Sequence, residues 1–181
     1  MIRRRLSLAA DQRGAAVIEL AMIAPVLALT VVGIVDMSNA FSRKLALEQG
    51  AQRAIEKIMQ TTETSTVQDT LTTEAVCQVN GMNADGSCKT SPIAASNVSV
   101  SWRRECTDAG GTLSNAPGSP YSSSTDFDNT ANACPAGTAA EANYIQVRID
   151  DAFTPMFPIH FASINADGTY HLSATAGMRT K

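Results

Sequence analysis

The sequence predicts an α+β protein in which a long N-terminal helix packs on a small antiparallel sheet. Three observations in its 181 residues lead to this fold class. An apolar run from Ala15 to Val35 contains a single charged residue, Glu19. Apolar residues then recur at three- and four-residue steps up to Gln60, and three stretches of the C-terminal half alternate between apolar and polar residues. The first two patterns are typical of helices and the third of strands with one buried face.

The apolar run is long enough to cross a membrane, since as a helix it covers about 30 Å, the thickness of the hydrocarbon core. It is preceded by a leader, residues 1–14, which has one acidic residue and four basic ones, Arg3, Arg4, Arg5 and Arg13. An excess of Lys and Arg normally stays on the cytoplasmic side. We therefore expect the chain beyond Asp36 to lie outside the cytoplasm.

The helix is expected to continue past Asp36, because Leu47, Ala51 and Ile55 follow at helical spacing. Pro25 removes a backbone donor and is expected to kink or loosen the helix before it. Gly50 costs up to about 1 kcal/mol relative to Ala, and we expect a bend there. A polar connector then leads to a shorter second helix over about residues 66–79.

Three strands are expected, over 98–103, 145–150 and 170–178. The apolar segment FTPMFPIHFASI connects the last two. We favour a role for this segment in capping the core, and the alternative is that it dips toward the membrane surface or a neighbour.

Four cysteines follow the membrane helix, and an oxidising compartment would pair them. Among the three possible connectivities we favour the two local pairs, Cys77–Cys88 and Cys106–Cys134. The second pair brackets most of a Gly-, Ser-, Thr- and Asn-rich segment from Thr107 to Asn143, which has no predicted secondary structure. A loop of that length is uncommon unless it is functional or pinned, and the disulfide would pin it.

The composition excludes several function classes. The chain beyond the leader is acidic and carries no basic stripe, so we expect no nucleic-acid partner. No phosphate-binding loop, zinc-protease motif or nucleophile elbow is present, so we expect neither enzyme activity nor a cofactor. A joint catalytic role of the two histidines, His160 and His171, and a cation site around Asp126 and Asp128 are both disfavoured against ordinary surface positions.

The start of the apolar run carries a more specific pattern. The junction RG|AAVIEL places a glycine, Gly14, before the run and a carboxylate, Glu19, at the fifth position counted from Ala15. This pattern resembles the processing site of type IV pilins and their minor relatives. The wider run RGAAVIELAMIAPVLALTVVGIVDMSNAF, with its APVL step at Pro25 and its Gly-x-x-Asp exit, resembles the TadE-like pseudopilins of tight adherence pili.

The resemblance implies a pilin-like architecture and a set of partners. It implies that a prepilin peptidase cuts after Gly14, and that Glu19 of one subunit meets the new amino group of Ala15 of another. The chain would then consist of a cleaved leader (1–14), a transmembrane helix (15–36), its extension (37–62) and a disulfide-stapled head (63–181). The resemblance further implies a single-pass inner-membrane protein with a periplasmic head, which becomes extracellular if it enters the filament.

The function implied is that of a minor pilin or pseudopilin in assembly of a tight adherence (Flp-type) type IV pilus, in adhesion or secretion machinery. Its partners would be the membrane, other pilins and pilus assembly proteins. The alternative from a different class is a permanently anchored surface adhesin or ligand-binding module, in which the 107–143 segment meets the ligand.

Overall fold

A computed structural model describes residues 13–60, 67–157 and 165–180. Residues 1–12 of the leader, the polar connector 61–66 and the segment 158–164, which includes His160, lie outside the described residues. The elements are, in order, α1 (Arg13–Gln60), α2 (Val67–Asn80), the 3-10 turn η2 (Ala95–Asn97), β1 (Val98–Thr107), β2 (Leu113–Asn115), α3 (Ser124–Asp128), the 3-10 turn η3 (Thr130–Asn132), β3 (Ala140–Phe153) and β4 (Tyr170–Arg179).

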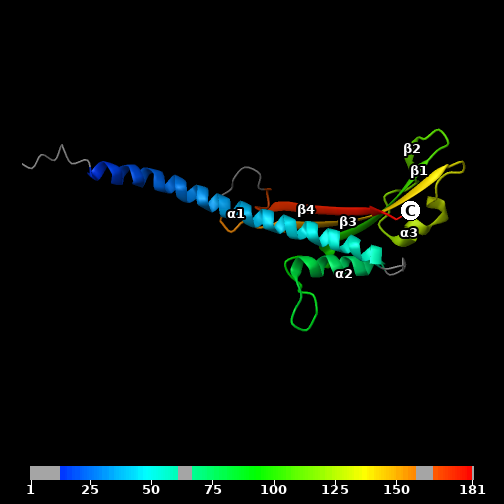
Figure 1. Cartoon of the computed structure of the whole chain (residues 1–181), viewed down its shortest axis with the longest axis horizontal. Coiled ribbons are helices and arrows are strands. Elements are labelled where there is room, and N and C mark those ends of the chain that lie inside the picture. Colours follow the sequence, from blue (N-terminus) through cyan, green and yellow to red (C-terminus); the bar gives the residue numbers. More distant parts are fainter. Residues whose placement is uncertain (1–12, 61–66, 158–164, 181) are drawn as a thin grey trace, which may run out of the picture.

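The predicted α+β fold class is confirmed. The sheet is antiparallel throughout, with the strand order β2-β1-β3-β4. Figure 1 shows α1 as a rod whose first part projects beyond the head and whose second part lies along the sheet, with α2 beside it. Both helices contact the sheet, α1 through β3 and β4 and α2 through β1.

The core lies between the two helices and the sheet, because each element turns one apolar stripe inward. One core cluster contains Trp102 of β1 and Ile149 of β3 together with Leu47 of α1 and Leu71 of α2. Alternate residues of the strands are buried, as the alternation in the sequence predicts. The buried residues of α1 from Asp36 to Ile55 lie on one face of the helix, at spacings that include four and seven residues.

α1 runs through Gly50 as an uninterrupted helix. Gly50 is buried at the crossing of α1 and α2. A Cβ added there would lie 2.5 Å from Cγ2 of Val79 and 3.2 Å from the carbonyl oxygen of Ala75. The glycine is therefore a close-contact position between two helices.

The segment from Thr107 to Asn143 is more regular than expected. β1 extends to Thr107 and β3 begins at Ala140, and the intervening chain forms the short edge strand β2 and the helices α3 and η3. Short elements of this kind carry too few periodic residues to be recognised in a sequence.

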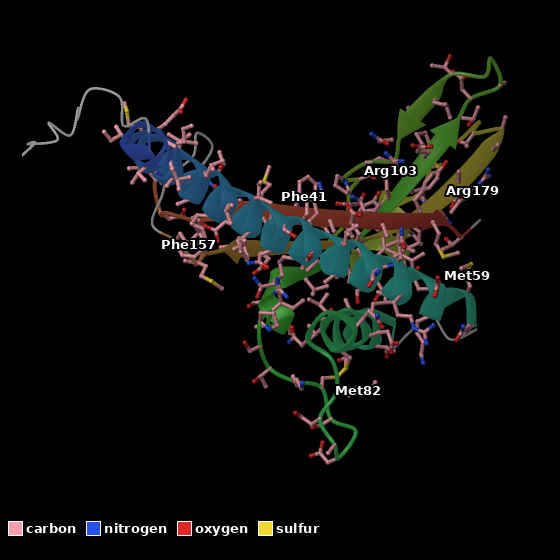
Figure 2. All side chains as sticks on the ribbon, turned by 60° about the vertical axis from the view of Figure 1, so that its left-hand side comes forward. Phe41, Met59, Met82, Arg103, Phe157 and Arg179 are labelled. Carbon is pink, nitrogen blue, oxygen red and sulfur yellow. A yellow bond between two sulfur atoms is a disulfide. The ribbon has the colours of Figure 1, made fainter. Side chains whose placement is uncertain are left out.

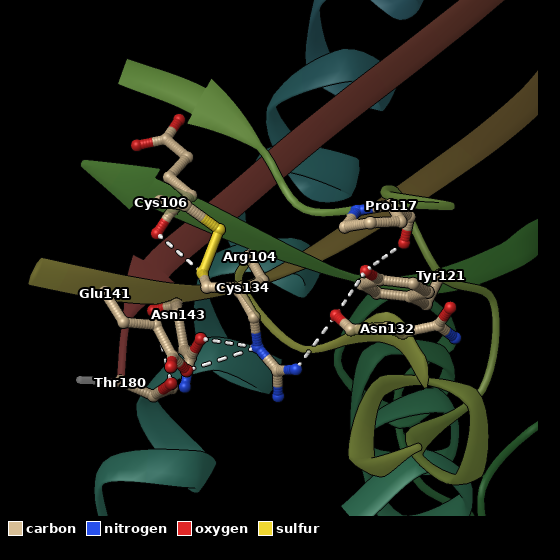
Figure 3. A network of polar contacts seen from close by, with 10 residues as sticks. Arg104, Cys106, Pro117, Tyr121, Asn132, Cys134, Glu141, Asn143 and Thr180 are labelled. Atoms are coloured by element: carbon tan, nitrogen blue, oxygen red, sulfur yellow. Dashed lines mark hydrogen bonds and ion pairs between the residues drawn. A yellow bond between two sulfur atoms is a disulfide. The ribbon is translucent and has the colours of Figure 1, made fainter. Parts of the chain in front are cut away.

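Buried Arg104 of β1 holds this segment against the sheet (Figure 3). Its Nε lies 3.2 Å from Oε1 of Glu141, and its Nη1 donates to the carbonyl oxygen of Asn132 at 3.1 Å. Its guanidinium lies over the ring of Phe127, 4.4 Å from the centroid. These contacts cross between β1, β3 and the end of the segment, so the segment is fixed by a buried cation as well as by a disulfide.

The structure pairs Cys77 with Cys88 and Cys106 with Cys134, which is the connectivity favoured from the sequence. The first disulfide joins the end of α2 to the hairpin-like turn that follows it. The second joins the outer end of β1 to the chain that leads into β3, beside Arg104 (Figure 3). Both disulfides lie in the head, away from the projecting part of α1.

Candidate functional site

The first part of α1 is an apolar rod that no other part of the described chain covers (Figure 1). Its most apolar 18-residue window has a mean hydropathy of 2.4, and none of this window is buried. The helix from Ala16 to Gln60 is long and apolar enough to span a membrane. The large exposed side chains of this part include Val17, Ile18, Leu20, Met22, Ile23, Val26, Leu27, Leu29, Val31 and Ile34.

The residues of the predicted processing site lie in the first turns of this rod. Gly14 and Glu19 are both exposed. A Cβ added at Gly14 would meet nothing within 4 Å, so no packing explains a glycine there. Glu19 follows Ala15 by four residues, so the two positions share one face of the helix. Pro25 is also exposed and lies inside the uninterrupted helix.

Asp36 marks the point where α1 enters the head, and its side chain is buried, with 5% of the residue exposed. Its two carboxylate oxygens accept hydrogen bonds from the backbone N–H groups of Met156, at 2.9 Å, and Phe157, at 3.2 Å. These residues follow β3, and Figure 2 shows Phe157 beside α1, at the opposite end of the hairpin from Arg179. A residue of the predicted exit motif thus attaches the head to the apolar part of α1.

A second contact lies two turns further along the same face of α1. Nε of Arg43 lies 2.6 Å from Oδ2 of Asp151 in β3, and the two side chains are only 13% and 11% exposed. Removing one partner of a buried pair like this one is destabilising, because it leaves the other charge buried and unpaired. Together, Asp36 and Arg43 connect α1 to the end of β3, which we call the junction.

Only residues 153–157 of the segment FTPMFPIHFASI are described, so its favoured role as a cap on the core stays a prediction. Within its described part, Phe153 and Phe157 are half-buried, but Met156 is 70% exposed. The backbone N–H groups of Met156 and Phe157 point toward Asp36. The described start of the segment therefore lies beside α1.

Replacing Asp36 by alanine should make the backbone amides of the junction more accessible to solvent. The change leaves the N–H groups of Met156 and Phe157 without their acceptors, which costs about 1–3 kcal/mol. We expect hydrogen exchange of these two amides to accelerate by at least about tenfold, and Asp36→Asn, which keeps one acceptor oxygen, to have an intermediate effect. The control is Asp128→Ala, at an exposed position in α3. Equal exchange rates in the Asp36 and Asp128 variants would contradict the role given to Asp36.

Several polar side chains of the described head surface form hydrogen bonds with near neighbours in the sequence. Asp126 accepts a hydrogen bond from the hydroxyl of Ser123 at the start of α3. Nε2 of His171 lies 2.7 Å from Oδ2 of Asp167, and hydrogen bonds from His171 and Thr169 lower the pKa of Asp167 to about 2. Across the described ranges, no group of three or more His, Cys, Asp or Glu side chains is placed to hold a metal ion.

Comparison with known proteins identifies the N-terminal segment. A family model described as TadE-like protein matches residues 14–55. This segment is TadE-like. No curated protein and no solved structure matches the chain.

The TadE-like segment contains the projecting rod, both residues of the predicted processing site and both α1 residues of the junction. It ends at residue 55, within the part of α1 that packs on the sheet. Asp36 appeared in the sequence only as part of the exit motif, and Arg43 was missed. An acidic residue directly after a long apolar run is a usable signal, because a charge there needs a partner.

Proposed function

We propose that this protein is a minor pilin or pseudopilin that takes part in assembly of a tight adherence type IV pilus. The observation that carries the proposal is the TadE-like segment on a free apolar helix, with Gly14 and Glu19 at its exposed start. In this proposal the chain is a non-enzymatic structural subunit that needs no cofactor. Its partners are a prepilin peptidase, other pilins and pilus assembly proteins.

The proposed topology follows from charge. Four arginines precede the apolar span, and the excess of basic residues stays in the cytoplasm. The head then lies in the periplasm of a single-pass inner-membrane protein. The disulfides Cys77–Cys88 and Cys106–Cys134 support this placement, because such bonds persist in oxidising compartments.

Glu19 has a specific role in the proposal. A carboxylate near the bilayer interior costs about 2.5–3.5 kcal/mol and needs a partner. Cleavage after Gly14 creates one, because the α-amino group of Ala15 is largely protonated near neutral pH. If Glu19 pairs with this group on a neighbouring subunit, only a cleaved neighbour can supply the partner. Assembly would then require prior cleavage.

The first test is the mass of the mature chain after co-expression with a prepilin peptidase of a tight adherence system. We expect residues 1–14 to be lost, so that the chain begins at Ala15. Gly14→Leu should abolish the cleavage without harming the fold, because a side chain at this position meets open space. Expression without the peptidase is the matched control. A chain that keeps Met1 in the presence of active peptidase would favour a permanently anchored surface protein instead.

A further inference from the structure

A groove runs along α1 where the apolar span meets the head. Its floor and one wall come from α1 between Thr30 and Lys44, and its other wall comes from the start of β4, at Tyr170 and Leu172. Its volume is about 720 Å³, within the range of small-molecule sites. We call it the α1–β4 groove.

The α1–β4 groove is apolar along most of its length. Ile34, Met37 and Phe41 line it at helical spacing, and all three are exposed. Phe41, labelled in Figure 2, is 59% exposed. On the opposite wall, the ring of Tyr170 stacks on Phe153 with the centroids 6.5 Å apart, which holds this wall in place.

The position of the groove indicates what fills it. Its first residues, Thr30 to Ile34, belong to the apolar span, so this end opens into the hydrocarbon core. The groove then follows α1 for about 21 Å, of which about 8 Å lies along the apolar span that ends at Val35 and the rest lies beyond it. It therefore continues from the acyl-chain region into the headgroup layer.

The outer end of the groove carries a positive charge, Lys44, whereas the carboxylate of Asp36, which also lines the groove, accepts hydrogen bonds from the backbone of Met156 and Phe157. The Cα–Cβ bonds of a helix tilt toward its N-terminus, so the long side chain of Lys44 can reach back toward the membrane surface. An apolar helix in the groove would leave this charge without a partner, whereas a phosphate at the headgroup level would pair with it. Each Lys near an anionic membrane surface contributes about 1 kcal/mol.

We propose that the α1–β4 groove binds one phospholipid with an anionic headgroup, its acyl chain along Ile34, Met37 and Phe41 and its phosphate at Lys44. The proposal rests on the membrane anchoring included in the proposed function. The bound lipid occupies the space between α1 and the hairpin and seats the base of the head on the outer surface of the inner membrane.

The test uses the full chain reconstituted in nanodiscs of phosphatidylcholine mixed with phosphatidylglycerol. The chain is released from the nanodiscs under mild conditions, and native mass spectrometry measures how many lipids it retains. The wild-type chain should retain one phosphatidylglycerol. Phe41→Ser should lower this retention about tenfold and Lys44→Gln about fivefold. The matched controls are Leu45→Ser, since Leu45 is equally exposed at 55% but does not line the groove, and Lys89→Gln in the head.

Flotation of the same chain with vesicles of this composition separates the two proposals. A chain that floats but retains no phosphatidylglycerol overturns the lipid site and leaves the proposed function standing, whereas a chain that does not float overturns both. Equal losses in Phe41→Ser and Leu45→Ser overturn the site, because the retention would then be unspecific. Disulfide cross-linking of Phe41→Cys between two copies in one nanodisc also overturns it, since a second α1 would occupy the groove.

Discussion

Replacing Gly50 by leucine should lower the free energy of unfolding by about 3 kcal/mol or more, the upper part of the range for overpacked cores. A Cβ at this position already lies 2.5 Å from Cγ2 of Val79 and 3.2 Å from Cδ1 of Ile149. Val79 is β-branched and stiff, and the Ala75 carbonyl on the same side belongs to the backbone of α2. The helices must therefore separate to admit the side chain, and the sheet loses part of its cover.

The measurement is chemical unfolding of the full chain in detergent, followed by the fluorescence of its single tryptophan, Trp102, which is buried in the core. Gly50→Ala should cost less, because a methyl group is smaller and alanine favours the helix by up to about 1 kcal/mol. Gln52→Leu, at an exposed position of α1, is the control for an added leucine. A Gly50→Leu variant as stable as this control would show that α1 and α2 do not pack closely at Gly50.

Replacing Glu19 by alanine should reduce assembled pili by about a hundredfold while membrane insertion stays intact. The α-amino group of the mature chain then has no partner in the assembly, and a lone charge in the bilayer costs about 2.5–3.5 kcal/mol, where each 1.4 kcal/mol is tenfold. The readout is the amount of pili sheared from cells that carry the variant. Mass spectrometry of the membrane fraction checks that the variant chain is inserted and processed.

Glu56→Ala is the matched control, because Glu56 is an exposed carboxylate of α1 whose ion pair with Arg53 lies at the surface. Such pairs contribute little to stability, so this variant should assemble normally. Normal amounts of pili from Glu19→Ala cells would rule out pairing with the amine as a required step.

Local pattern predicted most of the fold. The long apolar helix and three strands with alternating burial all have periodic signals, and the two disulfides join cysteines that are near in sequence. β2 and α3 are too short for such signals. Gly50 shows the limit of propensity, because a glycine that weakens an isolated helix is the residue that lets two helices approach.

The contacts of the junction could not be predicted from local sequence patterns, for a different reason. Asp36 and its partner Met156 are 120 residues apart, so no spacing rule relates them. Arg43 and Asp151 are charged, and charged residues are mostly exposed, so neither was expected at a buried contact. The same holds for Arg104, which looks like an ordinary polar residue of a strand until its partners are brought together.

Because α1 is an uninterrupted helix, it fixes the rotational orientation of the head about the helix axis. The same helix forms the anchor and one layer of the head's core, so the two share a single rigid axis. Because the anchor and the head share this axis, a rotation of the anchor about it turns the head by the same angle. The face that the apolar span presents to its surroundings therefore fixes the direction in which the head faces.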